Sequence, residues 1–471
     1  MRRLLIGAVT VTAVLLAGCS TRSDDTTGSG AAHNASPTAS GSGSSSADFG
    51  TLKDVCGPGT AESSTAKSST AESAPSQGVT ADRIQVGVMS DVGFTKNSEF
   101  VDAAKVFTSW CNDAGGINGR KLVPVTRDTK LTEVRQRVLE ACKADFALVG
   151  GGSALDSLGV QDRLKCLLPN FPGQSSQIGA IGSDLQVMAS QPVAGYFQYA
   201  GYYTWLLKDK YPDSAKKVGI IAGDSPVTKV MAAQFKEAVA GLGGTVSYSD
   251  LYPAAGVSDW TPYAQSIKNK GVRGLVFLGD FASLAKLEQA LTAIGYTPDW
   301  IDANSNAYGP AFLQLAGTAL AKQHNYAELF ATAPLESAAT NPATQQVIDL
   351  YKKYAPDKQV TYPALRAFSA WLLFATAARD CATLTRTCVY GNAAKNTDWT
   401  AGGLQAPFDL TSKQPTKCYS VVEATAKGWQ AADFQPDQGA YRCDAPVYKY
   451  QADYGKPATL ASVGKSMADL K

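Results

Sequence analysis

Short apolar runs alternate with helically spaced apolar positions through the middle of the chain. The run from Ile84 to Met89 is typical of a buried strand and ends in a polar turn at Ser90. From Glu99 to Asn112 the apolar residues recur at helical spacing, and this pattern stops at Gly115-Gly116. The alternation continues with expected strands at 121–126, 146–150 and 167–171 and expected helices at 131–144 and 154–164.

The same alternation restarts in the next part of the chain. An aromatic-rich helix is expected at 196–207, followed by strands at 218–222, 245–252, 274–278 and 300–301 and helices at 230–242, 263–270 and 283–294. Strands that alternate with helices of this length need crossover connections, which produce parallel sheets. We therefore predict an α/β fold of two doubly wound parallel-sheet lobes joined by a three-strand hinge.

The later chain is less regular and is expected to pack back onto the two lobes. Helices are predicted at 343–354 and 364–379, and a strand-rich stretch at 404–448. The expected organisation is a signal peptide at 1–18, a tether at 19–78, lobe 1 at 79–192 and 323–403, lobe 2 at 193–322 and 404–445, and a C-terminal tail at 446–471.

The amino end has the pattern of an export signal. Arg2 and Arg3 precede an apolar run at 4–17, and Leu16-Ala17-Gly18-Cys19 has the small residues of a cleavage site. The run is shorter than the roughly 20 residues of a membrane span. It resembles a lipobox, which implies that Cys19 carries a lipid and holds the protein on the extracytoplasmic face of the cell membrane. An ordinary signal peptide with an incidental cysteine is the alternative.

The segment that follows is dominated by Ser, Thr, Ala and Gly. Such a composition buries too little apolar surface to fold, so we expect a disordered tether, with Cys56 as the one point where it docks. Without Arg2 and Arg3 the chain has 41 basic and 41 acidic residues (43 minus 2 against 41). This balance argues against a nucleic-acid partner or a polybasic membrane patch, so the lipid is the expected membrane contact. We expect the protein to be a monomer.

Nine cysteines in an exported chain are interpreted as one lipidated residue and eight that can pair. The predicted disulfides are Cys381–Cys388, Cys418–Cys443, Cys111–Cys142 and Cys56–Cys166. The third pair rests on the two cysteines lying near the ends of consecutive helices, and the fourth is what remains. No CxxC spacing indicates a metal site.

Enzyme motifs are missing from the sequence. It has two histidines, His33 and His324, so a Ser-His-Asp arrangement has no suitable base, and no GxSxG, P-loop or dinucleotide motif occurs. We expect neither catalysis nor a cofactor.

Several segments together resemble the type I periplasmic binding proteins, in the branch that binds branched-chain amino acids, amides and urea for ABC importers. They are Ile84-Gln85-Val86-Gly87-Val88, Ala114-Gly115-Gly116-Ile117-Asn118-Gly119-Arg120-Lys121-Leu122, Val149-Gly150-Gly151-Gly152-Ser153, Lys217-Val218-Gly219-Ile220-Ile221, 240–246 and 366–371. The resemblance covers roughly residues 80–440 and implies a ligand cleft between the lobes and the permease subunits of an ABC transporter as partners.

Ligands of open parallel sheets bind outside the carboxyl ends of the strands, which places the candidate site in the loops there. The resemblance implies that Ser153 and Ser175, with Gln174 beside the latter, bind a ligand carboxylate, whereas a local helix cap is the alternative role of Ser153. The predicted ligand-binding residues are Asp91, Phe94, Ser153, Ala154, Gln174, Ser175, Tyr196, Asp224, Phe281, Ser305 and Tyr308.

One position departs from the family pattern. Amino-acid binders have an acidic residue on a strand-end loop of the second lobe, where this chain has Ser305 or Asn306. Asp224, Asp280 or Asp302 could substitute, although such acids often only cap a helix. The predicted function is capture of a small polar or carboxylate-bearing ligand, which could be amino-acid-like, an amide or an organic acid, for an ABC importer. A ligand-sensing receptor of the same fold is the alternative.

Overall fold

The structure is a computed structural model that describes residues 47–59, 76–190, 192–253 and 255–471. The predicted signal peptide and Cys19 lie outside these residues. The strands are β1 (Ala47–Phe49), β2 (Leu52–Cys56), β3 (Arg83–Ser90), β4 (Lys121–Asp128), β5 (Leu148–Val149), β6 (Asn170–Phe171), β7 (Tyr196–Phe197), β8 (Val218–Asp224), β9 (Val246–Pro253), β10 (Gly274–Leu278), β11 (Trp300–Asp302), β12 (Asn325–Glu328), β13 (Val421–Thr425), β14 (Gly428–Ala431) and β15 (Tyr448–Lys449).

The α-helices are α2 (Val92–Thr95), α3 (Glu99–Asp113), α4 (Val134–Ala144), α5 (Ser157–Lys165), α6 (Ala200–Thr204), α7 (Pro226–Gly241), α8 (Thr261–Asn269), α9 (Phe281–Ala293), α10 (Pro310–Ala316), α11 (Pro342–Tyr354), α12 (Tyr362–Arg379) and α13 (Arg386–Ala394). Short 3-10 or π turns fall at Trp205–Lys210, Pro212–Ser214, Ser305–Ala307, Gly317–Ala321, Leu335–Ser337, Ala401–Gly403, Ala461–Val463 and Met467–Asp469.

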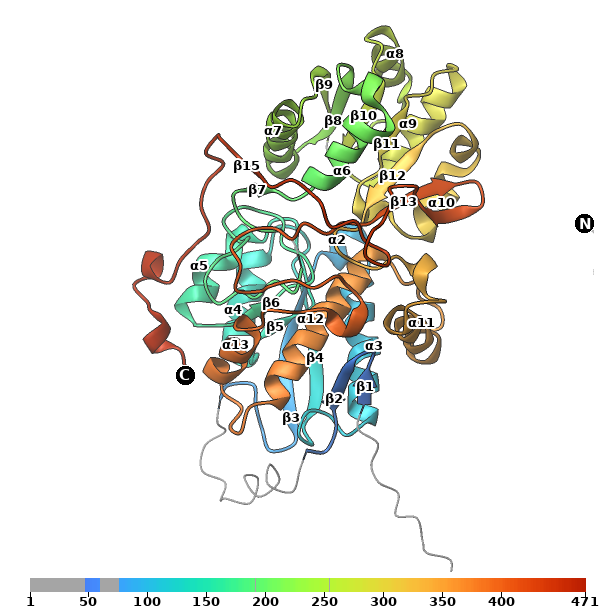
Figure 1. Cartoon of the computed structure of the whole chain (residues 1–471). Coiled ribbons are helices and arrows are strands. Elements are labelled where there is room, and N and C mark those ends of the chain that lie inside the picture. The colour runs from blue at the N-terminus through green and yellow to red at the C-terminus, as the bar shows by residue number, and fades with distance from the viewer. Residues whose placement is uncertain (1–46, 60–75, 191, 254) are drawn as a thin grey trace, which may run out of the picture. The chain divides into compact units, whose positions relative to one another are not determined.

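The first lobe is built on a parallel sheet of order β4-β3-β5-β6 (Figure 1). Alternate side chains of a strand point to opposite faces, so β3 contributes to two cores. Ile84, Val86 and Val88 face the core shared with α3 and α12, while Met89 packs on the other face against α4. Helices on both faces confirm the predicted doubly wound arrangement.

The second lobe is built on a sheet of order β14-β13-β12-β11-β10-β8-β9. The strands from β8 to β12 are parallel, and β13 and β14 extend the sheet antiparallel. Val276 and Leu278 face the core shared with α6 and α7, whereas Leu275 and Phe277 face that of α8, α9 and α10. Residues 325–328, which we expected in lobe 1, form β12 of this sheet.

Two other segments differ from the predicted structure. Residues 47–56 fall in the expected tether but form the hairpin β1-β2, whose Phe49 and Val55 are buried in the core of lobe 1. The expected aromatic helix from Tyr196 begins instead with the short strand β7, followed by α6 and a π turn. Sparse aromatic and apolar residues among Ser and Gly were too weak a pattern to reveal the hairpin.

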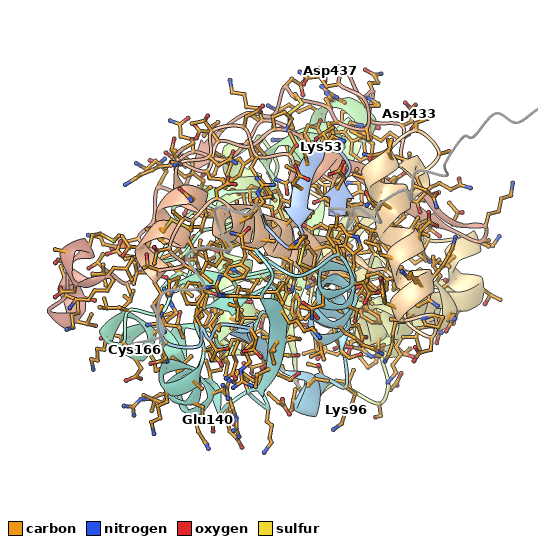
Figure 2. All side chains as sticks on the ribbon, turned by 90° about the horizontal axis from the view of Figure 1, so that it is seen from below. Lys53, Lys96, Glu140, Cys166, Asp433 and Asp437 are labelled. Atoms are coloured by element: carbon orange, nitrogen blue, oxygen red, sulfur yellow. A yellow bond between two sulfur atoms is a disulfide. The ribbon has the colours of Figure 1, made fainter. Side chains whose placement is uncertain are left out.

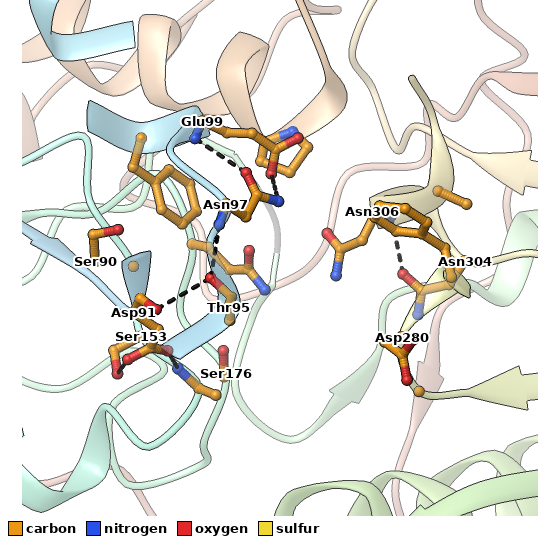
Figure 3. A pocket seen from close by; sticks show the side chains of 18 of the residues that line it. Ser90, Asp91, Thr95, Asn97, Glu99, Ser153, Ser176, Asp280, Asn304 and Asn306 are labelled. Atoms are coloured by element: carbon orange, nitrogen blue, oxygen red, sulfur yellow. Dashed lines mark hydrogen bonds between the residues drawn. The ribbon is translucent and has the colours of Figure 1, made fainter. Parts of the chain in front are cut away.

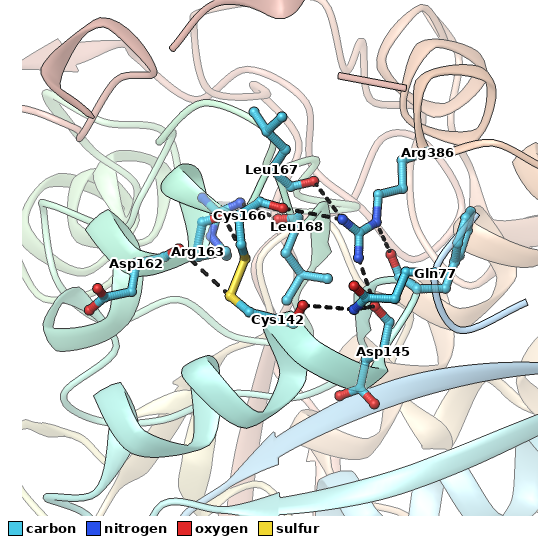
Figure 4. The surroundings of a disulfide bond; sticks show 10 residues. Gln77, Cys142, Asp145, Asp162, Arg163, Cys166, Leu167, Leu168 and Arg386 are labelled. Carbon is cyan, nitrogen blue, oxygen red and sulfur yellow. Dashed lines mark hydrogen bonds between the residues drawn. A yellow bond between two sulfur atoms is a disulfide. The ribbon is translucent and has the colours of Figure 1, made fainter. Parts of the chain in front are cut away.

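Two of the four predicted disulfides are confirmed and two are wrong. Cys381–Cys388 and Cys418–Cys443 are present, but the other pairs are Cys56–Cys111 and Cys142–Cys166. The consecutive helices α3 and α4 lie on opposite faces of the sheet, so Cys111 and Cys142 cannot meet. Instead the hairpin packs on α3, with 5.2 Å between the Cα atoms of Cys56 and Cys111, and α4 packs on α5, as Figure 4 shows for Cys142 and Cys166.

The C-terminal segment contacts both lobes. β15 pairs with β7, and the Glu237 carboxylate of α7 accepts hydrogen bonds from the Tyr454 hydroxyl (2.9 Å) and the Gln451 amide (2.6 Å). A few residues later the Ala458 amide donates to the Gly179 carbonyl (3.0 Å), and Leu460 packs on α5 in lobe 1.

Lys96 and Glu140 lie at the periphery of the molecule, as Figure 2 shows. Within the described ranges, none of the helices combines the length and hydrophobicity that crossing a bilayer requires.

Candidate functional site

A cavity of about 390 Å³ lies where strand-end loops of the two sheets face each other (Figure 3). Its volume is in the range of sites for small molecules. The first-lobe wall is lined by Ser90, Asp91, Thr95, Asn97, Glu99, Phe100, Gly152, Ser153, Ala154, Gln174, Ser176 and Pro363, and the second-lobe wall by Gly279, Asp280, Phe281, Ala282, Ala303, Asn304, Asn306 and Ala307. Apart from Pro363 of α12, these residues end or follow β3, β5, β6, β10 and β11, at the edge where loops of parallel strands converge.

Asp91, directly after β3, is the centre of the first-lobe wall. The residue is 9% exposed, and its carboxylate accepts hydrogen bonds from the Ser153 hydroxyl (2.9 Å), the Ala154 amide (2.7 Å) and the Thr129 hydroxyl. Ser153, which we expected to bind a ligand carboxylate, therefore donates to a carboxylate of the chain itself.

The glycines that precede Ser153 have a packing role. Gly150 has a φ of +67°, and a Cβ there would lie 2.2 Å from the Trp371 indole nitrogen of α12. A Cβ on Gly151 would lie 2.4 Å from the Met89 carbonyl. Only glycine lets the turn after β5 fit between β3 and α12, which aims Ser153 at Asp91.

A second carboxylate, that of the half-buried Asp156, holds the loop after β6. It accepts hydrogen bonds from the Ser175 hydroxyl (2.8 Å) and from the amides of Ser176 (2.9 Å) and Gln177 (3.0 Å). Burial raises the pKa of the Asp156 carboxyl to about 6, against the lowering effect of these donors. Ser175 thus faces Asp156, and its neighbours Gln174 and Ser176 line the cavity.

Glu99 is the other acidic residue of this wall and opens α3. Its Oε2 accepts a hydrogen bond from the Asn97 side-chain amide (2.6 Å), and the Asn97 Oδ1 accepts one from the Glu99 backbone amide (3.1 Å). Burial raises the pKa of the Glu99 carboxyl, and the nearby Asp102 raises it further. Phe100, the next residue, lines the same wall.

The second-lobe wall is more open. Asp280 is exposed and caps α9, accepting a hydrogen bond from the Ser283 amide (2.8 Å). Behind the wall, Asp302 accepts hydrogen bonds from the Tyr203 hydroxyl (2.6 Å) and the Asn304 amide (2.9 Å), and burial raises its pKa to about 6. Asp280 is therefore the acid that this wall presents to the cavity.

Five of the predicted residues line the cavity: Asp91, Ser153, Ala154, Gln174 and Phe281. Phe94 lies in the exposed α2, with 62% of its surface accessible, and Ser175 is buried against Asp156. Ser305 and Tyr308 are buried behind the second wall, where the Tyr308 hydroxyl donates to Glu336 (2.6 Å).

The remaining two predicted residues also lie elsewhere. Asp224 forms a surface ion pair with Lys229 at the start of α7. Tyr196 lines a separate cavity of about 240 Å³, together with Tyr450 and Tyr454 of the C-terminal segment. An acidic residue at a strand end and an aromatic near a loop were each too common to be assigned to the site from sequence.

The predicted list of ligand-binding residues omits several residues that line the cavity, including Thr95, Asn97, Glu99, Phe100 and Ser176. Glu99 and Phe100 were interpreted as the first turn of a helix, which they are, but that turn also faces the cavity. Pro363 opens α12, far along the chain, and no local pattern signals its place here. Asn97 and Glu99 could have been assigned to the cavity from sequence, because they lie at the end of the loop that follows β3.

Two doubly wound lobes with a cavity between facing strand ends define the type I periplasmic binding protein fold. The chain belongs to the periplasmic binding protein family, which matches residues 84–429.

Solved structures share this fold at low sequence identity. A fatty acid ABC transporter substrate-binding protein from Thermomonospora curvata is 17% identical, with a TM-score of 0.63 over 80% of this chain and 95% of that one. A branched-chain amino acid transporter substrate-binding protein from Streptococcus pneumoniae in complex with isoleucine is 19% identical, with a TM-score of 0.59 over 74% of this chain and 99% of the other.

A solute-binding protein of an ABC transporter from R. palustris in complex with 4-hydroxybenzoate is 17% identical, with a TM-score of 0.58 over 78% and 98% of the two chains. No curated protein sequence matches this chain.

Proposed function

We propose that the protein is an extracytoplasmic solute-binding protein that captures a small polar molecule between its lobes and delivers it to an ABC importer. The observation that carries this proposal is the cavity of about 390 Å³ whose walls come from the strand ends of both lobes. The solved relatives with this fold are described as binding isoleucine or 4-hydroxybenzoate, or as serving fatty acid transport. Their ligands differ widely, so the walls of this chain must determine its own ligand.

The proposed contacts follow from the lining. Gln174 and Ser176 of the first wall and Asn304 and Asn306 of the second offer amide and hydroxyl groups to the cavity. Phe100 and Phe281 offer apolar surface. In this proposal Ser153 and Ala154 act through Asp91, which they hold in place.

The proposed mechanism is closure of the lobes around the ligand, which removes the second wall from water and completes the contacts. A thermal-shift screen of amino acids, amides, amines, carboxylates and urea is the test, because a bound solute stabilises the folded state by about 2.7 kcal/mol at a hundredfold excess over its dissociation constant. We expect a hit that also reduces the radius of gyration in small-angle scattering and is recovered chemically unchanged. A screen without hits, or a hit that leaves the scattering profile unaltered, contradicts the proposal.

We further propose that Cys19 carries a lipid that keeps the protein at the membrane. The support is the sequence pattern before it, with two arginines, an apolar run and small residues. Labelling cells with a radioactive fatty acid should mark the wild-type protein and leave Cys19→Ala unlabelled and released from the membrane fraction. Equal labelling of both proteins would contradict the anchor.

A further inference from the structure

The cavity is lined by carboxylates on both walls and by no basic side chain. Asp91 and Glu99 belong to the first wall and Asp280 to the second, and none of the residues that line the cavity in the described chain is Lys, Arg or His. An entering anion would thus meet like charge on both sides, and the lining offers it no counter-charge.

Backbone amides and hydroxyls could bind an anion without a basic residue, but the best of them are occupied. Ser153, Ala154 and Thr129 all donate to Asp91. A ligand carboxylate at this place would have to displace Asp91 and leave that charge buried without partners, which is strongly unfavourable.

The ammonium groups of Lys96 and Lys358 are engaged outside the cavity. Lys96 donates to the Gly93 carbonyl (2.6 Å) and lies at the periphery of the molecule (Figure 2). Lys358 is 3.7 Å from the Asp102 carboxylate and 3.4 Å from the Ser98 hydroxyl. Neither lines the cavity, so neither neutralises Glu99 or Asp280 within it.

Aromatic rings complete this environment. Phe100 and Phe281 lie on opposite walls, each next to an acidic residue, Glu99 and Asp280 respectively. Ring faces and carboxylates both attract positive charge, and the ring also covers the apolar part of an organic molecule.

We propose that the cleft takes a small organic cation, an amine or ammonium compound whose remaining surface is neutral and lacks a carboxylate. This inference rests on the proposed solute-binding function and narrows it. Asp280 and Glu99 approach the positive group from the two walls on closure, and Gln174, Ser176 and Asn306 contact the neutral polar part.

The test uses matched compounds that differ in the carboxylate. Leucine, leucinamide and 3-methylbutylamine form one series, and phenylalanine, phenylalaninamide and phenethylamine another, with 4-hydroxybenzoate and isobutyrate as carboxylates without an amine. Affinities for the full-length chain in detergent are measured by calorimetry at neutral pH. We expect the amides or amines to bind at least tenfold tighter than the parent amino acids, and the simple carboxylates not to bind.

Asp280→Asn separates charge from structure, because asparagine still caps α9. This variant should lose at least tenfold in affinity for the amines. Asp213→Asn is the matched control, since Asp213 is 82% exposed and precedes β8, at the amino edge of the same sheet. It should bind as the wild type does.

Asp91→Ala tests whether Asp91 prevents a ligand carboxylate from binding to Ser153 and Ala154. It frees Ser153 and Ala154, so affinity for the parent amino acids should rise at least tenfold, and adding Ser153→Ala should reduce that gain. If Asp91→Ala does not fold, Asp91→Asn removes the charge while keeping the side chain in place, and should raise the same affinity.

The outcomes are distinguishable. Carboxylates that bind the wild type as tightly as the amines, or amine binding unchanged in Asp280→Asn, overturn the inference and leave the solute-binding function standing. Absence of binding by every compound in the series and in the broader screen overturns both.

Discussion

The two walls of the cleft contain equivalent strand-end loops with different surfaces. In the first wall Asp91 is buried and accepts hydrogen bonds from three groups, whereas in the second Asp280 is exposed and accepts one, from its own helix. Side chains held by internal bonds have already lost their rotamer freedom, while free ones lose it when a ligand binds. The first wall is therefore preorganised, and the second can adapt.

The first lobe also contains more disulfides than the second. Cys56–Cys111, Cys142–Cys166 and Cys381–Cys388 all lie in the first lobe, and Cys418–Cys443 lies in the second. Each of the following substitutions removes or tests one part of this contrast.

The largest expected effect is loss of the Cys56–Cys111 link in Cys56→Ser/Cys111→Ser. The two residues are 55 positions apart, so a chain-entropy argument predicts a free energy of unfolding lower by about 4 kcal/mol. Hydrogen exchange followed by mass spectrometry should show faster opening in the first lobe only. Cys418→Ser/Cys443→Ser is the control and should act on the second lobe. Uniform loss of protection in both variants would argue against lobes of independent stability.

The next effect is a pH dependence from Asp156. Its pKa is raised to about 6 in the folded protein, so the folded state takes up a proton before the unfolded chain does. The contribution of Asp156 to the free energy of unfolding is fully present below about pH 4 and is lost as the pH rises through about 6. A shift of about two pKa units corresponds to a change of about 3 kcal/mol. Urea unfolding of wild type and Asp156→Asn at pH 4 to 7 should show a flatter profile in the variant.

Asp302 provides the corresponding test in the second lobe. It lies behind the second wall, and burial also raises the pKa of its carboxyl to about 6. Asp302→Asn should flatten the profile in the same pH window. Profiles parallel to that of the wild type in both variants would contradict the assignment.

A smaller effect is expected for Asp91→Ala. Removing the acceptor leaves Thr129, Ser153 and the Ala154 amide without their partner but also removes a buried charge, for a net loss of about 2 kcal/mol in the free energy of unfolding. Urea unfolding at neutral pH measures it. A variant as stable as the wild type would show that the first wall does not depend on this network.

The smallest effect is expected for Asp280→Asn, which keeps the helix cap and lies on the surface. Its free energy of unfolding should stay within about 0.5 kcal/mol of the wild type. The same urea titration measures it, and a loss comparable with that of Asp91→Ala would remove the contrast between the walls.

The alternation of strands and helices was predictable because buried strands and amphipathic helices have distinct periods. β3, α3 and the strands from β8 to β11 lie close to their predicted positions. The faces that the helices cover were not predictable from local patterns, and this is why Cys111 was paired with the wrong partner.

The candidate site was predictable in place but less so in its contacts. The rule for strand ends located Asp91, Ser153 and Gln174, because it depends on topology alone. Whether Ser153 points to a ligand or to Asp91 depends on a contact between residues 62 positions apart, and no local pattern reveals it.

The C-terminal segment adds a limit on how far the cleft can open. Tyr454 is bonded to Glu237 in the second lobe, and Ala458 is bonded to Gly179 in the first. Four residue steps of extended chain span at most about 14 Å. While both attachments hold, this stretch and the Tyr454 side chain together limit the distance between Glu237 and Gly179, so the C-terminal segment would restrict opening in the proposed closure mechanism.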